Sequence, residues 1–179
     1  ATELSGFQLQ LDMSDTLVIA ISQSGTTTDT NRTVDLARSR GASVLAIVNR
    51  RGSELAAKAD GVLYTSDGRD VEMSVASTKA FYSQVSAGAL LACALSSALG
   101  SGTDAARHQL LTALRTVPDA MNRVLEMRPQ IAQAARQFAP ARRYWTVDGN
   151  GFYAVAAEEV RIKLSELSYK SIACDITED

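Results

Sequence analysis

Short, continuously apolar runs constrain the fold of this chain more than any other feature. Residues 16–22 and 43–49 form two such runs, and residues 61–65 form a shorter third. Runs of this length without polar alternation are typical of strands buried on both faces, as in a parallel sheet covered by helices. Apolar residues at helical spacing over 29–40, and a short helical segment at 53–59, separate the runs. The order strand, helix, strand, helix, strand predicts an α/β protein with right-handed crossovers.

The remainder of the chain is predicted to be mostly helical. Residues 75–99 form a long helical segment, and two further helices are predicted to begin at Pro118 and at Pro129, because proline suits the first turn of a helix. Residues 143–148 predict a fourth strand. A tight turn then leads into a helix that reaches Tyr169.

These elements predict a three-layer αβα architecture with a doubly wound parallel sheet. We expect a first lobe over residues 1–100, a helical connector over 101–140, and the start of a second lobe over 141–179. Strand, small-residue turn and helix recur near the beginning of both lobes. This recurrence suggests that the second lobe repeats the first.

Composition excludes several classes of function. The hydrophobic fraction is 46% and the formal net charge is −2, with the basic residues scattered, so we expect neither nucleic acid nor a membrane surface as a partner. The apolar runs are all shorter than the ~20 residues of a membrane span, and the polar start of the chain does not resemble a signal peptide. Two distant cysteines, Cys93 and Cys174, and the single histidine, His108, predict no metal site, no cofactor and a reducing, cytoplasmic location.

The turn that follows the first predicted strand carries the strongest local chemistry. Residues 22–27 read Ser-Gln-Ser-Gly-Thr-Thr at the start of a helix. Backbone N–H groups at a helix start, together with hydroxyl and amide side chains, can hold a phosphate without a basic residue. Serine and threonine also cap helices and stabilise turns. From composition alone, both interpretations remain open.

A second set of candidate residues lies on the last predicted helix. Glu159, Lys163 and Glu166 are spaced i, i+4 and i+7, which places them within an arc of roughly 60° on one helix face. Such a set can be a solvated ladder of ion pairs, each contributing only ~0.2–0.5 kcal/mol. It can also line a cleft in which a carboxylate transfers a proton.

Three segments together resemble a known family. The first is Ser-x-Ser-Gly-x-Thr at 22–27; the second is residues 72–81, with Val-Ala-Ser-Thr-Lys-Ala-Phe; the third is the helix at 159–169, with Lys-Leu-x-Glu-x-Ser-Tyr. In this order they are similar to the SIS (sugar isomerase) domains, and most similar to the isomerase domain of the glucosamine-6-phosphate synthases, also called glutamine–fructose-6-phosphate aminotransferases. The resemblance implies a flavodoxin-like fold.

The resemblance also implies roles for particular residues. A phosphate would be held by Ser22, Gln23, Ser24 and Thr27, and the sugar would contact Val75 and Ser77. Glu166 would act as the base and Lys163 as its partner at the C1 end of the sugar, with Glu159 orienting them. The implied reaction converts a ketose 6-phosphate to an aldose or amino-sugar 6-phosphate through an enediol. The implied ligands are fructose 6-phosphate, glucose 6-phosphate or glucosamine 6-phosphate, and the implied assembly is a homodimer.

The chain departs from the family pattern in places. Thr26 replaces an acidic residue and Ser165 a lysine, while Glu158, Val160 and Arg161 replace small or apolar residues. Segments that complete the family's site would lie outside the chain, so we expect part of one SIS repeat joined by helices to the start of a second, inactive when isolated. The parent protein would be an aldose–ketose isomerase or aminotransferase. Alternatives are a sugar-phosphate sensor without catalysis and an SIS lyase or deglycase.

Overall fold

The computed structural model describes residues 1–67 and 77–176. The chain divides into two compact units: Ala1–Met73 together with Ser77–His108, and Ser74–Ala76 together with Gln109–Asp179. Each unit is described by itself below. Val75, one of the residues implied to contact the sugar, lies outside the described residues.

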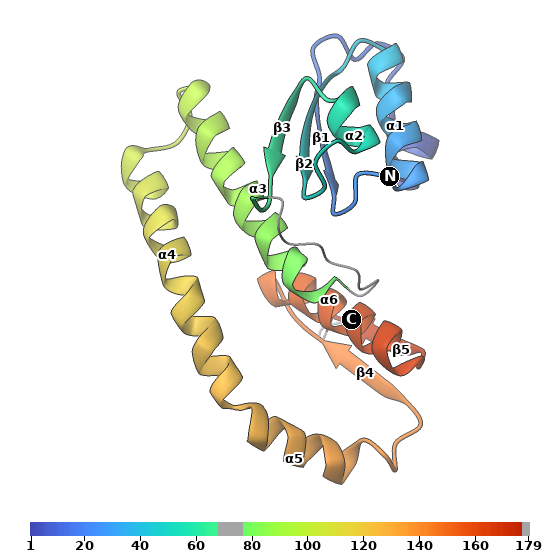
Figure 1. The fold of residues 1–179 in the computed structure, drawn as a ribbon, viewed down its shortest axis with the longest axis vertical. Helices are drawn as coiled ribbons and strands as arrows, with labels where there is room; N and C mark the ends of the chain where they lie inside the picture. Colours follow the sequence, from blue (N-terminus) through green and yellow to red (C-terminus); the bar gives the residue numbers. More distant parts are fainter. Residues whose placement is uncertain (68–76, 177–179) are drawn as a thin grey trace. The chain divides into compact units, whose positions relative to one another are not determined.

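A three-stranded parallel sheet forms the centre of the first unit (Figure 1). Its strands are β1 (Leu17–Ser22), β2 (Ser43–Val48) and β3 (Gly61–Tyr64), in the order β1-β2-β3. The pairing places Ile21 beside Ile47 and runs in the same direction along all three strands. Each apolar run therefore forms a parallel strand, as predicted.

Helices cover both faces of this sheet. The helices α1 (Thr28–Ser39) and α2 (Glu54–Lys58) pack on one face, and α3 (Thr78–Ala98) packs against β2 from the other. Because side chains alternate along a strand, β2 serves both layers. Its alternate residues join α1 and α2 in one core cluster, whose buried members are Ala20, Val34, Val44, Ala46, Val48 and Leu55. The predicted three-layer αβα arrangement is confirmed.

Short elements surround this core. A π-helical turn, η1 (Leu4–Gln8), precedes β1 and contacts α1. The helix α1 ends before Gly41, which has a φ of 96° and donates its N–H to the carbonyl of Arg38. A left-handed glycine in this place closes the helix.

The second unit contains a smaller parallel pair of strands. The helix α4 (Asp104–Glu126) begins in the first unit and continues into the second, where α5 (Arg128–Phe138) follows it. The strands β4 (Trp145–Asp148) and β5 (Ile172–Asp175) pair in parallel, with α6 (Phe152–Ser168) as the crossover between them. The strand β5 was not predicted, because only three consecutive residues, Ile172 to Cys174, are apolar there.

One predicted helix boundary is wrong. Pro118 lies inside the continuous helix α4 rather than at the start of a new helix. A proline within a helix removes one hydrogen bond, here to the carbonyl of Leu114. The helix α4 buries none of its residues, so solvent can hydrate the freed carbonyl and the helix can continue. Pro129 does lie in the first turn of α5, as predicted.

In residues 1–67 and 77–176, no helix combines the length and the apolar character that a membrane crossing needs. The longest of these helices, α4, has 23 residues, but it carries charged side chains throughout its length.

Candidate functional site

The turn at residues 22–27 lies at the carboxyl end of β1, where it leads into α1. The carboxyl ends of β2 and β3 lie at the same edge, because all three strands are parallel. Open α/β sheets bind their ligands at this edge. The turn therefore lies between a strand and a helix start, as the sequence predicted.

The carbonyl group of Gln23 is held from inside the protein. It accepts hydrogen bonds from the backbone N–H groups of Asn49 (3.2 Å) and Arg50 (3.3 Å), just beyond β2. In a trans peptide the C=O and the following N–H point in opposite directions. The N–H of Ser24 therefore points away from the β2 loop that holds this carbonyl.

The carbonyl group of Gly25 is held in the same way. It accepts from the backbone N–H of Leu55 (3.0 Å) and from Nδ2 of Asn31 (3.1 Å). The N–H of Thr26 consequently points away from α2. Two carbonyls of one short turn are therefore bound inward, which leaves the N–H of Ser24 on the open side, where it suits an anion.

Serine side chains complete the turn. The hydroxyl oxygen of buried Ser22 accepts from the N–H of Gly25 (3.0 Å), and that of Ser24 accepts from the N–H (3.2 Å) and the hydroxyl (3.0 Å) of Thr26. A hydroxyl that accepts can still donate its own hydrogen. The serines thus stabilise the turn, as one sequence interpretation stated, and they retain donors for a ligand, as the other required.

The start of α1 adds unused backbone donors. Thr27 is the N-cap residue, and its exposed side chain makes no capping hydrogen bond. The first intrahelical bond runs from the N–H of Asn31 to the carbonyl of Thr27 (3.0 Å). The N–H groups of residues 28–30 precede that bond, so the partial positive charge of the helix start lies beside the turn.

Only glycine fits the centre of the turn. Gly25 has a φ of 66°, and a Cβ placed there would lie 2.2 Å from Oγ of Ser53 and 3.0 Å from Cγ2 of Val48. Ser53 in turn caps α2 by accepting from the N–H of Ala56 (3.4 Å). The turn is therefore packed directly on the start of a second helix.

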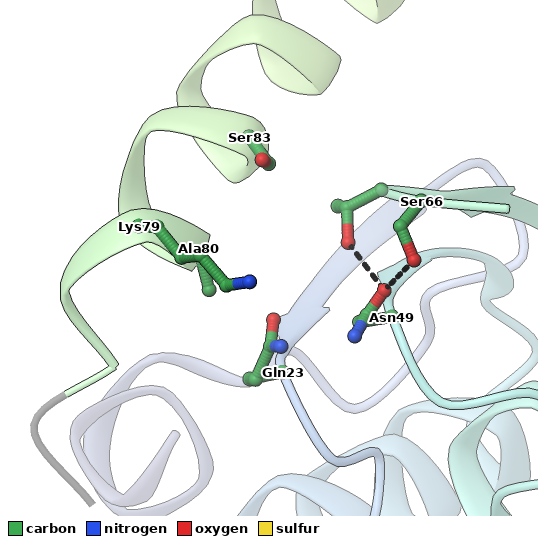
Figure 2. Close-up of a pocket in the computed structure, with 7 residues that line it drawn as sticks. Gln23, Asn49, Ser66, Lys79, Ala80 and Ser83 are labelled. Atoms are coloured by element: carbon green, nitrogen blue, oxygen red, sulfur yellow. Dashed lines mark hydrogen bonds between the residues drawn. The ribbon is translucent and has the colours of Figure 1, made fainter. Parts of the chain in front are cut away.

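A small polar pocket adjoins the turn (Figure 2). Its volume is about 50 Å³, enough for a few ordered waters or a ligand hydroxyl. Within the described residues, Oε1 of Gln23 is buried and makes no hydrogen bond, and Lys79 supplies a positive charge. The lining residues are Gln23, Asn49, Thr65, Ser66, Lys79, Ala80 and Ser83.

Asn49 joins the ends of three strands at this pocket. Its backbone binds Gln23 after β1, and its Oδ1 accepts from the hydroxyls of Thr65 (3.3 Å) and Ser66 (2.5 Å) after β3. Asn49, Thr65 and Ser66 were not among the site residues predicted from the sequence. The signal was present, because these polar residues directly follow apolar runs, and in a parallel sheet such positions share one edge.

Lys79 was also missed, although it lies in the second segment that resembles the SIS family. It stands in the first turn of α3, where the helix dipole disfavours a cation. Its ammonium group lies on the pocket side of the helix, near Gln23 (Figure 2). Ser77, implied to contact the sugar, precedes α3 with a φ of 48° and is half-buried.

The predicted Glu–Lys–Glu face lies on α6 of the second unit. Nζ of Lys163 and Oε1 of Glu159 form an ion pair of 3.0 Å, with 22% and 24% of the side chains exposed. Glu166 lies on the same helix and is exposed. The structure therefore brings Glu159 and Lys163 together. The 22–27 turn belongs to the first unit and this ion pair to the second.

Residues 1–67 and 77–176 contain no cluster of three or more His, Cys, Asp or Glu side chains that could hold a metal ion. Both cysteines are free thiols. Desolvation, with the neighbouring Glu158 carboxylate, raises the pKa of the Cys174 thiol, so this thiol stays protonated and is a poor nucleophile.

The chain is similar to known proteins over most of its length. Residues 1–94 match the model of the SIS domain family. The chain is 42% identical over 154 residues to a glutamine–fructose-6-phosphate aminotransferase (isomerizing) of Symbiobacterium thermophilum, covering 86% of the chain and 25% of the relative. The corresponding protein of Halobacterium salinarum is 37% identical over 155 residues, with 87% and 25% covered. The chain thus spans about a quarter of the length of these relatives.

A solved structure gives the same result for the fold. The C-terminal domain of glucosamine-fructose-6-phosphate aminotransferase from Francisella tularensis superposes with a TM-score of 0.88 at 26% identity, covering 97% of this chain and 48% of that one. The match confirms the predicted SIS fold and its partial extent. The chain therefore belongs to the SIS domain family, as a homologue of part of the glutamine–fructose-6-phosphate aminotransferases.

Proposed function

We propose that the chain binds a sugar phosphate and that the phosphate group occupies the 22–27 turn. The observation that carries this proposal is the inward binding of the Gln23 and Gly25 carbonyls. The N–H of Ser24 is then directed to the open side of the turn, beside the N–H groups at the start of α1. A phosphate accepts hydrogen bonds through several oxygens and is favoured at a helix start.

Four side chains of the turn take part in this proposal. Ser24 and Thr27 donate hydroxyl hydrogens to the phosphate, Gln23 donates through its amide, and buried Ser22 contributes mainly by holding Gly25 in place. Phosphate binding by neutral donors agrees with the absence of any lysine or arginine in residues 22–27. Specificity for an anion then comes from geometry rather than from net charge.

The sugar is proposed to extend toward the polar pocket. Ser77 lies just before α3, and Lys79 lies in its first turn, so both can reach a ligand whose phosphate is on the turn. Val75 is proposed as a further contact from the family resemblance. The candidate ligands are fructose 6-phosphate, glucose 6-phosphate and glucosamine 6-phosphate, which share the 6-phosphate that the turn would hold.

In the longer protein, we propose that this module isomerises a ketose 6-phosphate. Isomerisation moves a proton between neighbouring carbons through an enediol, and one carboxylate can make both transfers. Glu166 is the proposed base, and the Lys163 ammonium stabilises charge that develops on the sugar oxygens. Glu159 is the positioning residue, since its ion pair of 3.0 Å fixes Lys163. The relatives' name, isomerizing aminotransferase, supports this reaction class.

A sugar-phosphate sensor without catalysis is the second candidate. One observation favours it: the turn and the polar pocket are built from residues of the first unit. Recognition of the ligand therefore uses none of the Glu–Lys–Glu face. A sensor needs the turn, whereas an isomerase needs the turn and Glu166.

Calorimetric titration tests the binding proposal. We expect the chain to bind at least one of the three sugar phosphates, and glucose, which lacks the phosphate, not to bind. Ser24→Ala removes one donor and should weaken binding about tenfold, as a hydrogen bond to a charged group predicts. Ser39→Ala, at the far end of α1, is the matched control and should bind as the unmodified chain does. Equal affinity for glucose and glucose 6-phosphate would contradict the proposal.

Turnover separates the two candidate functions. In a longer protein that contains this chain, Glu166→Gln should lower the rate of isomerisation by about 10²–10⁴-fold, the usual contribution of a general base. Residues 1–179 alone should bind but not turn over fructose 6-phosphate. A longer protein that binds tightly and never isomerises would support the sensor instead.

A homodimer and a cytoplasmic location are further proposals. Leu17, Ile19 and Ile21 of β1 are 42%, 42% and 50% exposed on the sheet face that α3 leaves open. An apolar sheet face next to an unpaired edge favours association. Analytical ultracentrifugation tests the dimer, and a species that stays monomeric at high concentration would refute it.

We also propose domain boundaries near residues 100 and 140.

A further inference from the structure

Asn31 is a buried polar residue outside the set that the sequence predicted. It lies one turn into α1 and is 3% exposed. Its Nδ2 donates to two backbone carbonyls, those of Gly25 and Thr27, both at 3.1 Å. Asn31 thus bonds to the middle and to the end of the 22–27 turn with a single amide group.

The orientation of this amide follows from its partners. Two carbonyl oxygens require a donor, so the NH₂ group must face them. The opposite atom, Oδ1, is buried and makes no hydrogen bond to the described residues. If this position only filled the core, an apolar side chain would give a more stable protein, because a buried oxygen without a donor is unfavourable. The two bonds to the turn therefore explain the asparagine.

We propose that Asn31 is a positioning residue that fixes the 22–27 turn in its anion-binding conformation. This inference rests on the proposed function. By binding the carbonyls of Gly25 and Thr27, Asn31 sets the two peptide planes whose N–H groups belong to Thr26 and Thr28. Because each N–H points opposite to the carbonyl of its peptide, the N–H of Thr26 is directed at the Ser24 hydroxyl, to which it donates (3.2 Å). The N–H of Thr28 is directed toward the open side before any ligand arrives. Asn31 itself does not touch the ligand.

Fixing the turn in advance should raise affinity. A turn that samples several conformations must be ordered on binding, and this ordering reduces the observed affinity. Leu55 and Asn49 hold the same turn through backbone N–H groups, which remain after any substitution except one by proline. Asn31 holds it through a side chain, so its contribution can be removed by mutation.

Asn31→Ala is the main test, and Thr33→Ala is its matched control. Thr33 lies on the same helix, is 5% exposed, and shares its single hydroxyl hydrogen between the carbonyls of Asp29 (2.8 Å) and Ala1 (3.2 Å) rather than donating to the turn. Both variants lose a buried side chain that bonds two carbonyls. Affinity for glucose 6-phosphate and NMR order parameters of residues 24–28 in the ligand-free chain are measured for each. Asn31→Asp, of equal size but without the donors, is measured in the same way.

The expected result is an effect specific to position 31. Asn31→Ala should weaken glucose 6-phosphate binding about tenfold and lower the order parameters of residues 24–28, whereas Thr33→Ala should change neither. If the unmodified chain binds no sugar phosphate but Asn31→Ala still loosens the turn, the proposed function fails and the positioning role stands. The inference would be overturned if Asn31→Ala and Asn31→Asp left the order parameters of residues 24–28 unchanged. It would also be overturned if Thr33→Ala changed affinity and order parameters as much as Asn31→Ala, or if neither position-31 variant folded.

Discussion

The two compact units differ in how they bury apolar side chains. In the first unit, Val44, Val48 and Leu55 are fully buried between the sheet and its helices. In contrast, α4 and α5 bury none of their residues, and Leu125 and Phe138 remain 67% and 56% exposed. The first unit is thus stabilised by its own core, which allows it to hold a turn rigidly. The second gains much less from its own packing.

Buried polar residues follow the same division. The described residues include five buried polar residues, and all five lie in the first unit. Four of the five are in the 22–27 turn or contact it. The four are Ser22, Asn31, Asn49 and Ser53. Burying polar side chains is unfavourable unless they are bonded. Their concentration around one turn indicates that the turn's conformation, rather than general stability, accounts for them.

The largest expected difference between the units concerns leucines. Leu55→Ala should lower the free energy of unfolding by about 2–5 kcal/mol, because the site is fully buried and the cavity cannot collapse completely. Leu125→Ala, on α4, should change it by no more than about 0.5 kcal/mol. Urea denaturation followed by circular dichroism measures both. Similar losses at the two positions would contradict the comparison.

A smaller difference is expected between two glycines that have the same φ. Gly25 and Gly52 both have a φ of 66°, but only at Gly25 would a Cβ meet other atoms. Gly52→Ala should cost about 1–2 kcal/mol from backbone strain, and Gly25→Ala about 1–3 kcal/mol more from the clash with Ser53. Thermal unfolding gives the stabilities. If the two variants are equally stable, the turn is not packed on α2 as described.

Asp60 should give a smaller, pH-dependent effect. Hydrogen bonds from Arg38 (2.8 Å) and from the N–H of Val44 (2.7 Å) hold the pKa of Asp60 below its usual value. A lowered folded-state pKa stabilises the protein above the unfolded pKa, and this stabilisation is lost as the pH falls through the folded one. Asp60→Asn should therefore reduce the urea midpoint at pH 6, and the reduction should shrink as the pH falls below the usual pKa of an aspartate. A pH-independent difference would argue against the ion pair.

The smallest effect is expected at an ion pair of the second unit. Glu158 and Arg161 are 3.0 Å apart on α6, with 58% and 32% of their side chains exposed. Glu158→Gln should change the free energy of unfolding by at most about 0.5 kcal/mol, and the change should vanish in concentrated salt. Urea denaturation at low and at high salt measures it. A loss as large as that in Leu55→Ala would show that the second unit relies on charge pairs.

The fold of the first unit was predictable because its signals are local and strong. Each continuous apolar run forms one parallel strand, and Gly41 ends α1. The strand β5, which was not predicted, and the helix start wrongly predicted at Pro118 both lie where local sequence signals are weak. The four residues of β5 are stabilised by pairing with β4, which no sequence window contains, and Pro118 is tolerated because α4 is exposed.

The candidate site was predictable in part. The spacing of Ser22 to Thr27 located the turn, but it could not show which carbonyls are held inward. Asn31 and Asn49 act through bonds to residues 6 and 26 positions away along the chain, Gly25 and Gln23 respectively. Those contacts exist only once α1 and the β2 loop have packed. Sequence pattern locates the turn, whereas tertiary structure decides what the turn presents.

An NMR titration of the ¹⁵N-labelled chain with glucose 6-phosphate tests the central claim most directly. We predict saturable shifts of the backbone amides at residues 24–30, with little change in α4 or α5, and no such shifts with glucose. Shifts scattered over the surface, or equal shifts with both sugars, would contradict the claim that this turn is a phosphate site.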